Sequence, residues 1–284
     1  MAGTPKKLMK EAAVSLQEIM TEHLTEISAE MVRQFMARWR AGKESVAEVK
    51  WPGEMSYYDD IKTALTLLAT DAINSARKEV PAAKNIKLGH VEEGIQFAAT
   101  TVIFSALPTE VQNYIIKQTQ LLVGSHLGDL EKNLKFQYAD SFGTTDSEGT
   151  MEDDLSNVCV EFIEGNSVRA GANLLSSKTV NESRSAFFMD DDVLEELDAF
   201  EFVNGDPVTP VCQDLAGTIF AKDDPNMFRY TPPLHWNCKS YIQPILKGKL
   251  GKRDIDRLKP STKKLEDSIQ FSDAGLGCNC GSCS

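Results

Sequence analysis

The chain has 284 residues, of which 42% are hydrophobic and 25% are charged, as in a globular protein that buries its own core. Its net charge of −12 is concentrated, since residues 141–200 carry 14 acidic side chains against 3 basic ones. That span argues against DNA binding through its surface, because phosphates would be repelled. No signal-peptide pattern and no apolar run of about 20 residues is present, so we expect a soluble protein made inside the cell, without a membrane partner.

The first half of the chain has the periodicity of long amphipathic helices. Apolar residues at spacings of three and four predict a helix over residues 6–41. Three more helices are predicted, over residues 55–79, 91–107 and 109–136. Residues 1–140 are therefore interpreted as a helical N-terminal region. The apolar stripe of its first helix includes Phe35 and Trp39, which we take as a candidate interaction surface.

The composition changes after this region. Residues 141–156 are rich in Ser, Thr, Gly and acids, which indicates an acidic linker. A smaller domain is predicted over residues 157–246, with strand-like segments at 157–163, 197–203 and 218–220 and a helix at 170–189. The predicted fold class is α+β and mostly α, with a helical N-terminal assembly followed by a small mixed domain whose short strands surround a Cys/His turn.

The most specific segment is residues 206–244, which combines cysteines, a Pro-Pro pair and a His-x-x-Cys spacing. Cys212, His235 and Cys238 offer three ligands that a structural zinc ion accepts, although no fourth ligand is evident. Alternatively, the two cysteines are small buried residues and His235 hydrogen-bonds within the turn. A third alternative is a Cys–His nucleophile pair with Asp206 orienting the imidazole, although no nucleophile motif surrounds Cys212.

The C-terminal residues 247–284 are read as a basic stretch followed by a tail rich in Cys and Gly. Residues 239–264 hold 9 basic and 2 acidic side chains, so residues 247–264 are a candidate contact for DNA or for an acidic protein surface, with a solvated helix end as the alternative. Three interpretations are open for the tail cysteines Cys278, Cys280 and Cys283. They lie in a flexible end, chelate a soft metal or form a cross-link to a partner.

The segment 206–244 resembles the phage Mu protein F-like head morphogenesis family, the minor capsid proteins of tailed phages. The matching elements are Asp206, Cys212, Leu215-Ala216-Gly217-Thr218-Ile219-Phe220, Pro232-Pro233-Leu234-His235-Trp236-Asn237-Cys238 and the Pro-ending strand Tyr241-Ile242-Gln243-Pro244. Upstream, residues 178–184 are similar to the family's Arg-Thr…Asn helix, with Lys178 where Arg is usual. The resemblance covers residues 170–245.

Two departures from the family pattern bear on the metal hypothesis. Many members have further cysteines where this chain has Thr209 and Ser240. Because both are missing together, the extra pair is interpreted as a dispensable bridge or ligand set. We therefore expect no cofactor, with zinc at Cys212, His235 and Cys238 as the alternative.

The resemblance implies a non-enzymatic structural protein of the virion that associates with the portal vertex and assists head assembly, DNA packaging or delivery. The implied partners are portal and capsid proteins. The residues expected to form the core of the structural turn are Asp206, Cys212, Gly217, Pro232, Pro233, His235, Asn237 and Cys238. The competing hypothesis is a metal- or thiol-dependent enzyme or effector delivered with the virion.

Overall fold

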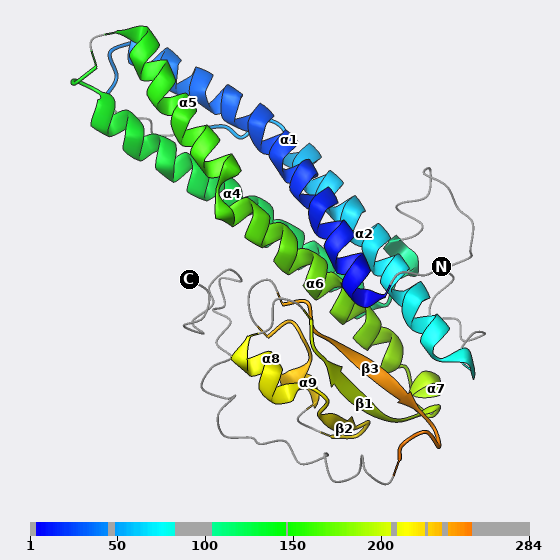
Figure 1. The fold of residues 1–284 in the computed structure, drawn as a ribbon. Coiled ribbons are helices and arrows are strands. Elements are labelled where there is room, and N and C mark those ends of the chain that lie inside the picture. The colour runs from blue at the N-terminus through cyan, green and yellow to red at the C-terminus, as the bar shows by residue number, and fades with distance from the viewer. Residues whose placement is uncertain are drawn as a thin grey trace. The chain divides into compact units, whose positions relative to one another are not determined.

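The computed structural model describes residues 4–44, 49–82, 104–145, 147–205, 209–224, 227–234 and 238–251. These residues are mostly α-helical and include one small antiparallel sheet, so the predicted fold class is confirmed. The long helices are α1 (Pro5–Arg40), α2 (Glu54–Glu79), α4 (Thr109–Ser141), α5 (Glu148–Glu164) and α6 (Asn166–Phe188) (Figure 1). The short helices are α7 (Asp191–Leu194), α8 (Pro210–Leu215) and α9 (Met227–Tyr230), and the strands are β1 (Leu197–Val203), β2 (Ile219–Ala221) and β3 (Tyr241–Leu246).

Several sequence predictions lie outside the described residues. Asp206, His235 and Asn237 are among them, as are most of the predicted helix 91–107 and the tail beyond residue 251. Within the described ranges, none of the helices combines the length and the apolar character that a bilayer crossing requires.

The helices α1, α2 and α4 confirm three of the four helices predicted for the first half of the chain, and α4 ends five residues later than predicted. Gly42 follows α1 with φ +65° and donates its N–H to the Trp39 carbonyl, a left-handed end that glycine adopts without strain. Gly53 has φ +86° and precedes α2, which ends two residues before Pro81. The helix boundaries therefore follow local chain chemistry.

Helix α5 contradicts two predictions, the acidic linker over residues 141–156 and the strand over 157–163. Ser147 caps the helix by accepting a hydrogen bond from the Thr150 N–H, and an acidic side chain in the first turn is favourable at a helix N-terminus. The buried residues are Met151, Leu155 and Cys159. Their spacing of four places one residue per turn on a single face, while the acids occupy the exposed side.

The described residues group into two compact units, and each unit takes segments from both halves of the chain. We name them the helical unit (Val14–Lys62 and Lys117–Ala172) and the sheet unit (Met1–Ala13, Thr63–Ile116 and Asn173–Ser284). This differs from the predicted succession of an N-terminal region, a linker and a C-terminal domain. The reason is that long helices contribute different turns to different units.

The helical unit is held by aromatic and polar contacts between distant segments. The Phe35 and Tyr138 rings lie 5.4 Å apart, and the Tyr138 hydroxyl donates to the Lys43 carbonyl at 2.6 Å. The Tyr57 hydroxyl lies 2.8 Å from Nδ1 of His126, and both side chains are buried. Arg40 at the end of α1 forms an ion pair with Glu148 in the first turn of α5.

The sheet unit contains a three-stranded antiparallel sheet in the order β2-β1-β3 (Figure 1). In the central strand, Phe200 pairs with Phe220 of β2 and with Pro244 of β3. The strand over 197–203 is therefore confirmed, and β2 begins one residue later than predicted. The unit's core joins Met9 of α1, Leu68 and Ala72 of α2 and Val180 of α6, with Tyr241 of β3 packed against this cluster.

Candidate functional site

Two residues of the predicted turn core, Cys212 and Cys238, lie side by side. Their sulfur atoms are 3.8 Å apart, and neither side chain has exposed surface. No disulfide joins them in this structure. Pro210 occupies the first turn of α8, and the helix buries Cys212 together with Leu215. The segment resembling the family thus brings two sulfurs together from positions 26 residues apart.

The surroundings of Cys238 favour its thiolate form. The pKa of Cys238 is lowered to about 6, chiefly by the hydrogen bond from Cys212 and further by backbone hydrogen bonds from Leu234 and Ser240 and by the Ser240 hydroxyl. Burial acts in the opposite direction. At Cys159 burial dominates: desolvation raises the pKa of that thiol to about 11, although a hydrogen bond from the Ser28 side chain acts in the opposite direction. The cluster of donors therefore distinguishes Cys238.

The two sulfurs fit part of a zinc site. Two thiolates bound to one tetrahedral zinc lie about 3.8 Å apart when each Zn–S bond is about 2.3 Å long. The same separation suits a thiol–thiol hydrogen bond. His235, the third predicted ligand, lies outside the described residues, and no group of three or more metal-ligating side chains occurs in the described ranges. Zinc would take Cys212 and Cys238 as two of its ligands.

A stripe of polar side chains on α6 binds the backbone of the chain entering β3. Ser177 donates to the Cys238 carbonyl, the Asn181 amide donates to the Ser240 carbonyl at 3.1 Å, and Arg184 donates to the Ile242 carbonyl at 3.1 Å. Positions 177, 181 and 184 share one helix face, whereas positions 238, 240 and 242 share one edge of an extended segment. We call these six residues the α6–β3 connection.

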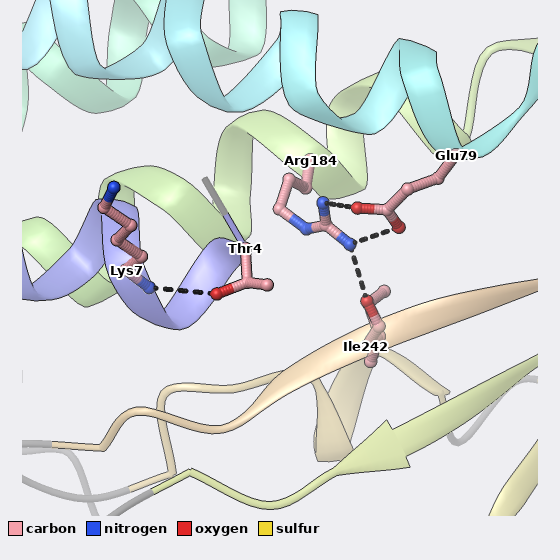
Figure 2. A network of polar contacts seen from close by, with 5 residues as sticks. All are labelled: Thr4, Lys7, Glu79, Arg184 and Ile242. Atoms are coloured by element: carbon pink, nitrogen blue, oxygen red, sulfur yellow. Dashed lines mark hydrogen bonds and ion pairs between the residues drawn. The ribbon is translucent and has the colours of Figure 1, made fainter. Parts of the chain in front are cut away.

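Arg184 is the best-anchored member of this connection. Its side chain has no exposed surface, yet its two terminal nitrogens contact the Glu79 carboxylate at 2.6 and 2.9 Å (Figure 2). The guanidinium also lies over the rings of Phe188, 5.1 Å from the centroid, and Tyr241, 5.7 Å away. The buried charge is therefore balanced by a carboxylate, a carbonyl and two aromatic faces, while the buried Nε of Arg184 has no hydrogen-bond partner.

The edge of the sheet explains why this connection exists. Strand β3 has β1 on one side only, so its outer carbonyls need partners. Ile242 directs its carbonyl to Arg184, and Pro244, two residues on, has the same orientation in the strand. The N–H that proline lacks would therefore also point away from β1, as expected for proline in an edge strand. Helix α6 covers that edge with side-chain donors.

Ser240 and Gly205 close the start of the strand. Gly205 donates its N–H to the Ser240 hydroxyl at 3.1 Å, and a Cβ on Gly205 would lie 2.0 Å from the carbonyl carbon of Lys239. The Lys239 ammonium donates to Asn173 Oδ1 at 2.8 Å, and burial lowers the pKa of Lys239 to about 8. Ser240 therefore has a structural role here.

The remaining predicted turn residues also have structural positions. Gly217 has φ +69° and donates its N–H to the Phe202 carbonyl at 2.9 Å, which joins the turn after α8 to β1. Pro232 and Pro233 are buried and joined by a cis peptide bond. None of the described predicted turn residues lines the sheet unit's cavity of about 520 Å³, whose walls include Glu110, Glu182 and Met227.

Phe35 and Trp39 were predicted to form an interaction surface, and the structure corrects this for Phe35. Its side chain is fully buried against Tyr138 in the helical unit, because the apolar stripe of α1 faces the unit's own core. Trp39 is partly exposed. Ser177 was not predicted to have a role, and Asn181 was noted only as part of the helix that resembles the family's. Their signal in the sequence is their three-to-four spacing with Arg184 on one face of α6.

No protein-family model, curated protein or solved structure matches this chain. Its functional interpretation therefore rests on the geometry of the α6–β3 connection and of the Cys212–Cys238 pair, together with the resemblance of residues 170–245.

Proposed function

We propose that the chain is a structural minor protein of a tailed-phage head, associated with portal and capsid proteins and assisting head assembly, DNA packaging or delivery. It works in the virion through contact surfaces and not through a reaction. The resemblance of residues 170–245 to the Mu F-like head morphogenesis family is the origin of this proposal.

The single observation that carries the proposal is the α6–β3 connection. The helix and the Pro-ending strand are two separate parts of the resemblance, and buried hydrogen bonds from Asn181 and Arg184 join them. These polar side chains serve internal contacts between segments about 60 residues apart, with sequence separations of 59 and 58. Because these polar side chains are used for internal hydrogen bonds, they support the interpretation of this region as a rigid framework that presents its outer surface to partners.

The test is whether the chain enters phage heads. The protein would be co-expressed with the portal and major capsid proteins of a tailed phage, and purified heads would be assayed by quantitative mass spectrometry and by immunogold labelling. We expect a few copies per head and labelling at one vertex. Absence from the heads under conditions where portal is incorporated would contradict the proposal.

A matched pair of variants connects this test to the structure. Arg184→Ala removes the connection's anchor and should reduce incorporation, whereas Arg33→Ala alters an exposed arginine of α1 paired with Glu30 and should not. Circular dichroism of both variants separates loss of folding from loss of docking. If Arg184→Ala were unfolded by circular dichroism and still entered heads as well as Arg33→Ala, the folded framework would not be required for incorporation.

One observation favours a second function, thiol- or metal-dependent chemistry. Cys238 has a pKa lowered to about 6, which raises the fraction of nucleophilic thiolate at neutral pH. The native protein would be treated with iodoacetamide, and the alkylation rates of Cys238 and Cys159 compared by peptide mapping alongside a metal assay. A hyperreactive Cys238, or stoichiometric metal with an open coordination position, would favour the enzyme over the structural protein.

A further inference from the structure

Cys212 and Cys238 lie in two segments that are not paired with each other in the sheet. Cys212 belongs to the short helix α8, and Cys238 lies three residues before β3. The chain between them contains β2 and α9. A covalent bond between the two sulfurs would therefore close a loop around one edge of the sheet unit.

We propose that Cys212 and Cys238 are a native dithiol that a hydroperoxide converts into a disulfide, which cross-links α8 to the segment entering β3. The inference concerns the two thiols themselves and does not depend on the proposed function.

The geometry suits this bond. A disulfide has an S–S length of about 2.0 Å, so the sulfurs must approach by about 1.8 Å from their 3.8 Å separation. Helix α8 has six residues, and its N-cap residue Thr209 makes no side-chain capping hydrogen bond. The Thr209 hydroxyl is moreover buried without a partner. A small shift of α8 therefore breaks no side-chain cap.

The pair contains both sulfurs that the oxidation requires. A thiolate is the form that attacks a peroxide, and the second sulfur, 3.8 Å away, is placed to act as the resolving thiol. With Cys238 as the attacking sulfur, Cys212 supplies that resolving thiol, as required for a disulfide to follow the first oxidation.

The reaction balances in two steps. The Cys238 thiolate attacks one oxygen of hydrogen peroxide, which breaks the O–O bond, forms a sulfenic acid and releases hydroxide. The Cys212 sulfur then attacks the sulfenic sulfur, forms the S–S bond and displaces the hydroxyl group, which leaves as water with the Cys212 proton. Two thiols are oxidised by two electrons, the peroxide is reduced, and the released hydroxide is protonated by solvent to the second water.

Tryptic mapping of the full chain tests the proposal, because the sequence separates the relevant cysteines. Cleavage after Arg184, Lys222, Arg229 and Lys239 places Cys212 in the peptide 185–222 and Cys238 in the peptide 230–239. Cys159 and the tail cysteines fall in other peptides. The native protein would be treated with hydrogen peroxide, its remaining thiols alkylated under denaturing conditions, and the unreduced digest analysed by mass spectrometry.

We expect peptides 185–222 and 230–239 to be recovered mainly as one species, lighter by two hydrogen atoms than their sum, while Cys159 is recovered alkylated. The oxidised protein should unfold at a temperature higher by roughly 5 °C or more, since the bond restricts the unfolded chain. Dithiothreitol should reverse the shift, and Cys212→Ser should abolish both the linked species and the shift.

Three results would overturn the proposal. The first is recovery of both cysteines as alkylated thiols at peroxide concentrations that oxidise the tail cysteines, which would show a sealed structural pair. The second is sulfinic or sulfonic acid at Cys238 without the linked peptide. The third is stoichiometric zinc in the purified protein, with the link forming only after chelation, which would make the sulfurs metal ligands instead.

Discussion

Arg184 of α6 and Glu79 of α2 form a two-point ion pair, with nitrogen–oxygen distances of 2.6 and 2.9 Å, although the arginine side chain has no exposed surface. Figure 2 shows the same guanidinium reaching the Ile242 carbonyl of β3. One side chain thus connects two helices and a strand. Removal of Glu79 would leave the buried Arg184 charge unpaired, and removal of Arg184 would leave a partly exposed carboxylate, so the pair is a sensitive point of the sheet unit.

Arg184→Ala should lower the free energy of unfolding by about 3–5 kcal/mol, since it leaves the Glu79 carboxylate and the Ile242 carbonyl without their donor. Urea denaturation followed by circular dichroism measures the change. Arg33→Ala is the matched control, because its pair with Glu30 is exposed and should be worth at most about 1 kcal/mol. A similar small change in both variants would show that the Glu79 pair is not structural.

Asn181→Ala should cost about 1–3 kcal/mol, because it removes the amide that donates to both the Ser177 and the Ser240 carbonyls inside the protein. Asn113→Ala, at an exposed position of α4, is the control and should change stability by less than about 0.5 kcal/mol. Hydrogen exchange gives a second readout, with faster exchange expected in β3. Unchanged protection of β3 in Asn181→Ala would exclude a role for this amide in holding the strand.

Gly205→Ala and Gly124→Ala should have opposite effects on the stability of the protein. A Cβ at residue 205 would lie 2.0 Å from backbone of Lys239, so the strand entry must move and the melting temperature should fall. A Cβ on Gly124 meets no atom within 4 Å, and alanine is favoured over glycine in a helix by about 0.5–1 kcal/mol. Thermal unfolding of the two variants checks the signs. A neutral Gly205→Ala would mean that the strand entry tolerates displacement.

Acid should destabilise the protein through His126. Burial lowers the pKa of His126 to about 4, below the usual value of about 6.5, so the unfolded chain binds a proton that the folded chain resists. The contribution of the neutral His126 to the free energy of unfolding is fully present above about pH 6.5. It is lost as the pH falls toward 4, by up to roughly 3 kcal/mol. Chemical denaturation at a series of pH values measures this slope.

The variant His126→Gln isolates that contribution. Glutamine cannot be protonated in this range, so the difference in unfolding free energy between wild type and variant should shrink as the pH falls from 6.5 to 4. The carboxylates contribute equally to both proteins and cancel. Parallel pH profiles would refute a buried neutral imidazole at this position, which the 2.8 Å contact with the Tyr57 hydroxyl otherwise stabilises.

Sequence periodicity predicted the long helices of the first half of the chain. It did not predict α5, whose first half is rich in acidic residues. Helices α1, α2 and α4 carry apolar residues at every turn, and this local pattern is readable without tertiary information. The first half of helix α5 was interpreted as part of an acidic linker because residues 141–156 are rich in Ser, Thr, Gly and acids. Its buried residues are only one per turn, which suffices once another helix covers that face.

The candidate site was predicted in part. The family resemblance identified Cys212 and Cys238 as belonging to one module, and their sulfurs are neighbours. The contacts of that module were not predicted, because residues 178–184 were identified only as a helix similar to the family's and the sequence does not indicate what their side chains contact. Only the position of the edge strand β3 shows that these polar groups face unpaired carbonyls.

The amino-acid sequence by itself determined where the first helices and β1 form, because these depend on the spacing of side chains along one segment. Tertiary structure alone decided that the apolar stripe of α1 is internal, that segments from both halves of the chain share each compact unit, and that Arg184 meets Glu79. Those relationships depend on which segments meet in space, where apolar stripes, charges and backbone groups are buried against partners far along the chain, and the periodicity of one segment does not identify its partner.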